Sequence, residues 1–178
     1  MGPLSSPEVA GGRQPESLRV VSHSPEETHL LGALLGRLVG RGDVILLIGG
    51  LGTGKTCFTQ GIAHALGVTD YVTSVSFVLL GEYQGRLPLY HADLFRLDSL
   101  EEVAELGLDD VVYQGGVLVI EWAEKGLSAF PREHLQVHIE YLGEHIRRLF
   151  FVPQGEHYRE VVVALGKMLP EREGERWN

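Results

Sequence analysis

The sequence predicts an α/β fold in three layers, in which helices cover both faces of a mixed, centrally parallel sheet with an antiparallel edge hairpin. Two short, continuously apolar runs, residues 44–48 and 117–120, are typical of parallel strands that are buried on both faces. A glycine-rich segment and a helical pattern directly follow the first run. Residues 135–141 alternate between apolar and polar side chains, which predicts a strand with one face in water. This mixture of strand and helix patterns is typical of layered α/β domains.

The expected elements in chain order are a strand at 18–22, a helix from 25 to near 40, a strand at 44–48, a helix at 55–66, strands at 77–83 and 87–93, a helix at 99–106, strands at 117–120, 135–141 and 146–152, and a helix at 158–169. Ser24 and Glu27 form a capping-box pattern at the start of the first helix, with Pro25 at its first position. Leucines at helical spacing then predict one apolar face. Gly67 is placed to close the second helix.

In the second half of the chain, turn and cap residues separate the predicted elements. A Gln-Gly-Arg turn at 84–86 joins the two strands before it and after it. Ser99 is a helix N-cap, and Glu102 follows it by three residues, as in a capping box. Gly143 and Glu144 form the turn of the predicted hairpin. The hairpin therefore supplies the antiparallel part of the sheet.

One folded domain is expected at residues 17–169, between an N-terminal tail at 1–16 and a polar C-terminal tail at 170–178. A chain of 178 residues buries roughly 70% of its unfolded surface, and its 44% hydrophobic content can supply the core. The segment 1–16 mixes Gly, Pro, Ser and charged residues without apolar periodicity, which is typical of a flexible tail.

Composition excludes several classes of protein. Cys57 is the only cysteine, which excludes a disulfide framework or a zinc site of paired cysteines and favours the reducing cytoplasm. No apolar run approaches the roughly 18 residues that span a bilayer, so no membrane association is expected. A net charge of −9 and only three lysines argue against direct binding to the phosphates of DNA or RNA. Nucleic acid could still be reached through a partner protein.

The glycine-rich segment reads GGLGTGKT from position 49 to 56 and matches the phosphate-binding loop pattern G-x-x-x-x-G-K-[ST]. Backbone N–H groups of such a loop surround phosphate oxygens, and the N-terminus of the following helix adds positive charge. Lys55 should reach the phosphates, and Thr56 should supply a hydroxyl to Mg²⁺. The sequence therefore predicts nucleotide binding on a P-loop NTPase-like fold. The predicted nucleotide-binding residues are Gly49, Gly50, Leu51, Gly52, Thr53, Gly54, Lys55, Thr56 and Cys57.

Two acidic residues are candidates for holding the magnesium ion or orienting water. Glu121 ends the apolar strand at 117–120, and Asp93 ends the less apolar strand at 87–93. The sequence alone does not rank them decisively, but apolar context favours Glu121 for the metal. Asp93 is then the candidate water-orienting group or general base.

The nucleotide is expected to be ATP, because the Asn-Lys-x-Asp run and the D-x-x-G switch of Ras-like GTPases are missing. Scattered arginines also argue against a small kinase with an arginine-rich lid. The pair Arg147 and Arg148 is interpreted as part of a solvated face. His91 is interpreted as a structural hydrogen-bonding residue, and Cys57 as a packing residue whose pKa the helix dipole could lower.

Four ordered motifs resemble the TsaE (YjeE) family, a small P-loop ATPase family of bacterial tRNA threonylcarbamoyladenosine synthesis. The loop at 49–56 resembles that family's G-[DE]-L-G-A-G-K-T, with Gly50 in place of the acid. The segment TSVSF at 73–77 is similar to K-S-P-T-F, without its proline. HADLFR at 91–96 resembles H-x-D-x-Y-R, and IEW at 120–122 matches the family's I/V-E-W.

The resemblance implies an ATPase that acts with a TsaB/TsaD-type transferase complex on the adenosine beside the tRNA anticodon, and meets tRNA only through that complex. It implies that Thr56 and Glu121 hold Mg²⁺, that Lys55 binds phosphates and that Asp93 assists the attacking water. It also implies a switch-like loop and an adenine pocket, with Ser74 and Ser76 in the loop and Thr28 at the pocket.

Two other functions remain alternatives. The departures from the family pattern at Gly50 and Val75 favour a nucleotide-loaded binding module, whose hydrolysis is incidental. A small P-loop kinase with an unrecognised acceptor is the third possibility.

Overall fold

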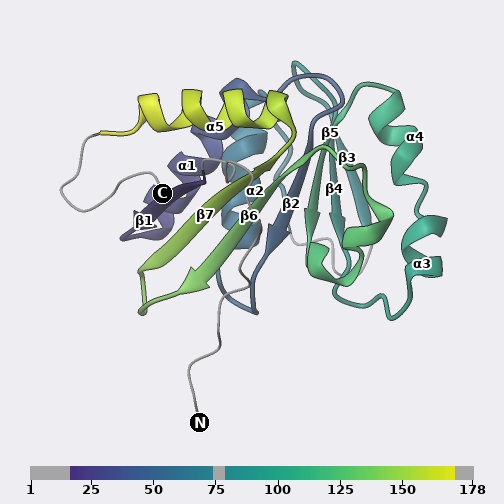
Figure 1. Ribbon diagram of the computed structural model, residues 1–178, viewed down its shortest axis with the longest axis horizontal. Coiled ribbons are helices and arrows are strands. Elements are labelled where there is room, and N and C mark those ends of the chain that lie inside the picture. The colour runs from purple at the N-terminus through teal and green to yellow at the C-terminus, as the bar shows by residue number, and fades with distance from the viewer. Residues whose placement is uncertain (1–16, 74–78, 171–178) are drawn as a thin grey trace, which may run out of the picture.

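The computed structural model describes residues 17–73 and 79–170. Its elements, in chain order, are β1 (Leu18–Ser22), α1 (Pro25–Leu38), β2 (Val44–Ile48), α2 (Lys55–Ala65), β3 (Leu80–Tyr83), β4 (Leu89–Asp93), α3 (Leu100–Glu105), α4 (Leu108–Tyr113), β5 (Val117–Glu121), the 3-10 turns η1 (Ala123–Lys125) and η2 (Leu127–Ala129), β6 (His134–Tyr141), β7 (Arg147–Gln154) and α5 (Glu156–Met168). The strands form one mixed sheet in the order β1-β7-β6-β2-β5-β4-β3 (Figure 1).

The centre of the sheet is parallel and its flanks are antiparallel. Strand β2 lies between β6 and β5 and runs parallel to both, and β5 is parallel to β4. Strand β7 is antiparallel to β6 and to β1, and β3 is antiparallel to β4. The predicted fold class is confirmed, including the hairpin of β6 and β7. The hairpin lies one strand in from the edge, because β1 covers its outer side.

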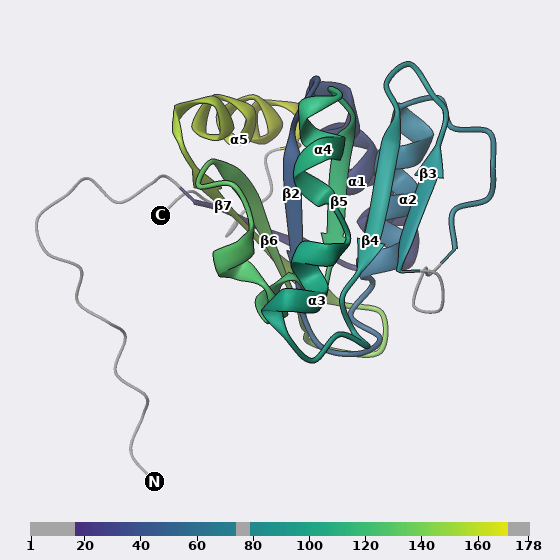
Figure 2. The same ribbon diagram turned by 90° about the vertical axis from the view of Figure 1, so that its right-hand side faces the viewer.

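Helices α1, α2 and α5 pack on one face of the sheet, and α3 and α4 pack on the other (Figure 2). Alternate residues of the central strand supply the two cores. Ile45 and Leu47 belong to the cluster with α1, α2 and α5, whereas Val44 and Leu46 belong to the cluster with α3 and α4. Successive side chains of a strand point to opposite faces, so a strand between two helical layers must be apolar at every position.

Helices α1 and α2 pack closely because glycines line their contact. A Cβ atom added to Gly61 of α2 would collide with the backbone carbonyl oxygen of His29 in α1. A Cβ atom on Gly32 of α1 would collide in the same way with the carbonyl oxygen of Phe58. The absence of side chains at these two positions therefore sets how near α2 lies to α1.

Most predicted elements are confirmed, with shifts at their ends. Strand β4 begins at Leu89 and not at 87, because Pro88 has no N–H to donate to a ladder. Helix α5 begins two residues earlier than predicted, at Glu156. The short helix α4 and the two 3-10 turns were not predicted, since each is too short to show a helical repeat.

The first helix cap differs in detail from a capping box. The Ser24 side chain accepts a hydrogen bond from the N–H of Glu27, as predicted. The Glu27 carboxylate accepts from the N–H of His23, one residue before the expected donor. At α3 the capping box of Ser99 and Glu102 is complete.

Some predictions fall outside the described residues. They are the tail at 1–16, the tail from 171 onward, and the start of the strand predicted at 77–83, which begins at Leu80 in the described part. Ser74 and Ser76 also lie outside the described residues. Within 17–73 and 79–170, the structure contains no helix with the length and apolarity needed to cross a membrane.

Candidate functional site

The loop at 49–54, which the sequence predicts to bind phosphate, joins the carboxyl end of β2 to the start of α2. Gly49 lies against β6, where an added Cβ atom would stand 2.5 Å from the carbonyl oxygen of Ile139. Gly54 has a φ of 100°, a left-handed conformation that favours glycine, and it precedes the first residue of α2. No side chain caps this helix start. Its first N–H groups are therefore available to an anion.

The Lys55 ammonium lies over the loop. It donates hydrogen bonds to the carbonyl oxygens of Gly49 at 2.5 Å and Gly50 at 2.8 Å, and it stands 4.1 Å from the centre of the Trp122 ring. Burial lowers the pKa of Lys55 from its ordinary value, and the negative charge of Glu121 is the largest of the influences that oppose this shift. The site thus holds a buried cation beside the loop.

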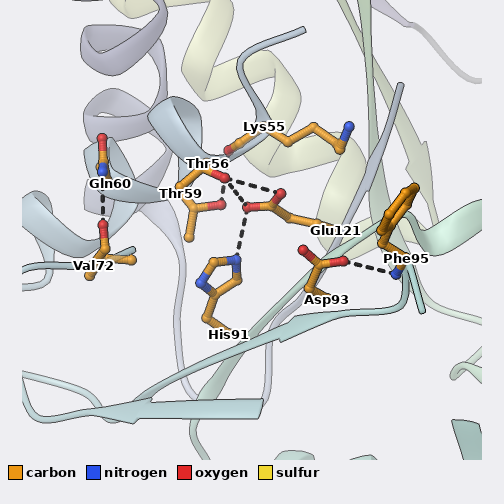
Figure 3. A network of polar contacts seen from close by, with 9 residues as sticks. All are labelled: Lys55, Thr56, Thr59, Gln60, Val72, His91, Asp93, Phe95 and Glu121. Atoms are coloured by element: carbon orange, nitrogen blue, oxygen red, sulfur yellow. Dashed lines mark hydrogen bonds and ion pairs between the residues drawn. The ribbon is translucent and has the colours of Figure 1, made fainter. Parts of the chain in front are cut away.

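Thr56 and Glu121 meet at the mouth of the loop (Figure 3). The Thr56 hydroxyl donates to the two carboxylate oxygens of Glu121, at 3.0 Å and 3.2 Å. The Nε2 atom of His91 lies 2.9 Å from Oε1 of the same carboxylate. A carboxylate only accepts hydrogen bonds, so Nε2 of His91 carries the hydrogen. These contacts from α2 and β4 orient Glu121 at the end of β5, where its side chain is almost fully buried.

His91 therefore acts as the structural hydrogen-bonding residue that the sequence predicts. It is fully buried, and its Nδ1 atom has no hydrogen-bond partner among the described residues. A protonated ring would bury a second N–H without an acceptor, which is costly. The geometry therefore favours the neutral tautomer with hydrogen on Nε2.

Asp93 and Glu121 end adjacent parallel strands and are aligned in the register of β4 and β5. Both are buried, but their contacts differ. Oδ1 of Asp93 accepts a hydrogen bond of 2.8 Å from the N–H of Phe95, in the loop that follows β4. Glu121 contacts Thr56 instead. The two acids therefore stand side by side at the loop with different surroundings (Figure 3).

A cavity of about 460 Å³ brings most of the predicted site residues together. The loop, the start of α2 and the ends of β4 and β5 form its wall. Its lining residues are Leu51, Gly52, Thr53, Gly54, Lys55, Thr56, Cys57, Asp93, Phe95, Arg96, Glu121 and Trp122. Gly49 and Gly50 are not among the lining residues, and their carbonyl groups accept hydrogen bonds from Lys55.

Thr28 lies elsewhere, in a smaller cavity of about 170 Å³ that it shares with Thr53, Gly54 and Cys57. The two cavities therefore meet at the loop. Burial raises the pKa of the Cys57 thiol from its ordinary value, so the helix dipole does not dominate there. The thiol donates to the carbonyl oxygen of Pro25 at 3.2 Å.

Arg147 has a different environment from the solvated face predicted for it. Its guanidinium donates to the loop carbonyl oxygens of Thr53 at 3.0 Å and Gly52 at 3.2 Å, so the solvated-face interpretation is wrong for it. The interpretation holds for Arg148, which pairs with Glu140 at the surface. No local sequence signal indicated the position of Arg147, because it follows from the pairing of β6 with β2, which brings the β6–β7 turn to the same sheet edge as the loop.

The residues present fit Mg²⁺. This cation prefers oxygen ligands and usually takes only one or two protein carboxylates, with waters and substrate phosphates completing an octahedron. Thr56 and Glu121 supply a hydroxyl and a carboxylate at hydrogen-bond distance from each other. Among the described residues there is no group of three or more His, Cys, Asp or Glu side chains that could hold a metal alone. A magnesium ion held by Thr56 and Glu121 would need phosphate and water as its remaining ligands.

The fold and the loop define this chain as an α/β protein of the P-loop NTPase-like class. A crystal structure of YdiB from Bacillus subtilis superposes with a TM-score of 0.77 at 34% sequence identity, covering 88% of this chain and 98% of that one. Residues 22–149 match the family model described as "Threonylcarbamoyl adenosine biosynthesis protein TsaE". The chain belongs to the TsaE family.

Two relatives show how much of the chain the similarity covers. The protein named "tRNA threonylcarbamoyladenosine biosynthesis protein TsaE" in Treponema pallidum is 42% identical over 132 residues, which are 74% of this chain and 98% of that protein. The protein of the same name in Bacillus subtilis is 39% identical over 145 residues, or 81% of this chain and 90% of that protein. The resemblance inferred from four motifs is therefore confirmed at the level of family.

Proposed function

We propose that this protein binds and hydrolyses ATP with Mg²⁺ in the threonylcarbamoyladenosine modification of tRNA. The observation that carries the proposal is the direct contact of Thr56 with Glu121 at the cavity that Lys55 also lines. A hydroxyl, a carboxylate and a buried ammonium meet where the loop presents its N–H groups. This is the set of groups that phosphoryl transfer to water needs.

In the proposed complex, the phosphates of ATP lie in the 460 Å³ cavity against the N-terminus of α2. Lys55 must exchange its hydrogen bonds with the carbonyl groups of Gly49 and Gly50 for bonds to phosphate oxygens. Its ammonium remains against the Trp122 ring and neutralises phosphate charge. The adenine extends towards the smaller cavity lined by Thr28 and Cys57.

Thr56 and Glu121 would hold Mg²⁺, which neutralises charge on the phosphates when it is bound. His91 keeps the Glu121 carboxylate in place through its hydrogen bond. Asp93 stands beside Glu121 and faces the same cavity, where it can accept a proton from the attacking water or orient it. Each residue thus has a separate task.

We further propose that ATP turnover acts on a TsaB/TsaD-type transferase complex and that tRNA is contacted only through this complex. The names of the relatives place those proteins in the biosynthesis of the modified nucleoside. The net charge of this chain, −9 at pH 7, favours contact with a protein partner over direct contact with tRNA phosphates.

Phosphate release by the purified chain with Mg²⁺-ATP, alone and with a TsaB/TsaD-type complex, tests the proposal. We expect weak release that rises when the complex is added and that Lys55→Ala abolishes. Tight ATP binding without stimulated release would refute the hydrolytic function. That result would support the nucleotide-dependent binding module instead.

A further inference from the structure

Arg147 uses all of its side-chain nitrogens to hold two separate backbone segments. Its Nε and one terminal nitrogen donate to the loop carbonyl oxygens of Thr53 and Gly52, as described above. The other terminal nitrogen donates to the carbonyl oxygens of Gly143 at 2.7 Å and Ile146 at 3.0 Å in the β6–β7 turn. The guanidinium carbon lies 4.5 Å from the Tyr141 ring centre. The planar guanidinium group is therefore held by the loop, by the β6–β7 turn and by the Tyr141 ring.

The two loop contacts determine where loop N–H groups point. In a trans peptide, the carbonyl and the N–H of one plane point in opposite directions. The Gly52 carbonyl shares its plane with the N–H of Thr53, and the Thr53 carbonyl shares its plane with the N–H of Gly54. Because Arg147 draws both carbonyl groups to its own side, both N–H groups face away from it.

The side away from Arg147 is the proposed phosphate site. Arg147 lines the smaller cavity on one side of the loop, while Thr53 and Gly54 line both that cavity and the larger one. Lys55 and Thr56 stand in the larger cavity. Donors aimed before the ligand arrives need no reorganisation when it binds, so fixed N–H groups strengthen phosphate binding.

We propose that Arg147 is a positioning residue that aims the N–H groups of Thr53 and Gly54 at the phosphates of the bound nucleotide. This inference rests on the ATP binding proposed above. Arg147 is not assigned to the phosphates themselves, because it lines the smaller cavity and is not among the residues that line the larger one, whereas Lys55 is. The same contacts join the loop to the β6–β7 turn.

Three variants separate the hydrogen-bonding geometry of the planar guanidinium group from its positive charge. Arg147→Ala removes both, Arg147→Lys keeps the charge without that geometry, and Arg148→Ala removes a neighbouring arginine that pairs with Glu140 at the surface. We expect Kd for Mg²⁺-ATP to rise about tenfold in Arg147→Ala, as expected for losing charge-assisted hydrogen bonds that fix two donors. Arg147→Lys should resemble Arg147→Ala, and Arg148→Ala should stay within about twofold of the wild type.

A second measurement needs no nucleotide. Backbone ¹⁵N order parameters of Thr53 and Gly54 should be near 0.85, as in rigid backbone, and should fall below about 0.6 in the Arg147 variants. Core strand β2 should keep its values in every variant, which distinguishes a local effect from loss of folding. Should Arg147→Ala fail to fold, Arg147→Lys supplies both readouts.

Unchanged Kd values and order parameters in the Arg147 variants would overturn the proposal. A full return of affinity in Arg147→Lys would also overturn it, because charge alone would then explain the effect. If the wild-type chain bound no ATP, the function proposed above would fail. The order parameters would then decide alone whether Arg147 holds the loop.

Discussion

Replacing Glu121 by glutamine should separate the stability of the site from its chemistry. The carboxylate accepts from the Thr56 hydroxyl and from Nε2 of His91. Glutamine has nearly the same volume, and its oxygen can still accept from His91. The Thr56 hydroxyl can turn to accept from the new amide group, since a hydroxyl both donates and accepts. His91 and Thr56 therefore both keep a hydrogen-bond partner in the variant.

The expected magnitudes follow from these contacts. With its hydrogen bonds replaced, Glu121→Gln should lose no more than about 1 kcal/mol of unfolding free energy, or about 2–4 °C in Tm. Glu121→Ala would leave the buried N–H of His91 unpaired and should lose about 1–3 kcal/mol before any cavity is counted. Loss of the negative charge at the metal position should lower ATP turnover by about 10²- to 10³-fold.

The assay is initial phosphate release at saturating Mg²⁺-ATP with the transferase complex present, with Tm measured on the same samples. Glu124→Gln is the matched control, because it removes one negative charge at an exposed position three residues further along the chain. Turnover by Glu121→Gln within about threefold of this control would refute the proposed metal ligand. Rescue by excess Mg²⁺ would instead indicate a weakened but intact site.

Three further predictions concern packing, burial and pH. Gly61→Ala forces a Cβ atom into the backbone of α1 and should cost about 1–3 kcal/mol or more in denaturant unfolding, whereas Gly40→Ala has open space around it and should be near neutral. Tyr158→Phe removes the oxygen that accepts from the buried N–H of Val44 at 2.8 Å and should lower stability by about 1–3 kcal/mol; an unchanged Tm would contradict this. Because burial raises the pKa of Cys57, the native thiol should stay protonated at pH 7–8, and its alkylation should accelerate only above the pH range where an unfolded cysteine reacts. Equal pH profiles for the native and urea-unfolded chains would disprove the last of these.

The strands and helices around the candidate site were predictable because strong local signals mark them. The run from Val44 to Ile48 is apolar at every position, and the structure places it at the centre of a sheet with helices on both faces. Ser24 and Ser99 mark helix starts through hydrogen bonds that span only three residues. Helix α4 gave no such signal, since it has one turn and a half and begins at a glycine without a side-chain cap.

The order of the strands needed the tertiary structure. Local patterns predict that β6 and β7 form a hairpin, but not that β1 joins its outer side or that β6 lies next to β2. Pairing between strands distant in the sequence depends on which apolar faces the helices cover. That is a property of the packed molecule and not of any short segment.

The amino-acid sequence by itself determined the chemical groups of the site, because the loop pattern requires glycines, a lysine and a hydroxyl at fixed spacing along one strand, loop and helix. Only the tertiary structure decided how distant residues complete that site. It joined Thr56 to Glu121 across 65 positions and brought Arg147 to the loop from 94 positions away. The physical reason is that parallel strands bring their carboxyl ends to one edge of a sheet. Residues far apart in the chain thereby become hydrogen-bond partners.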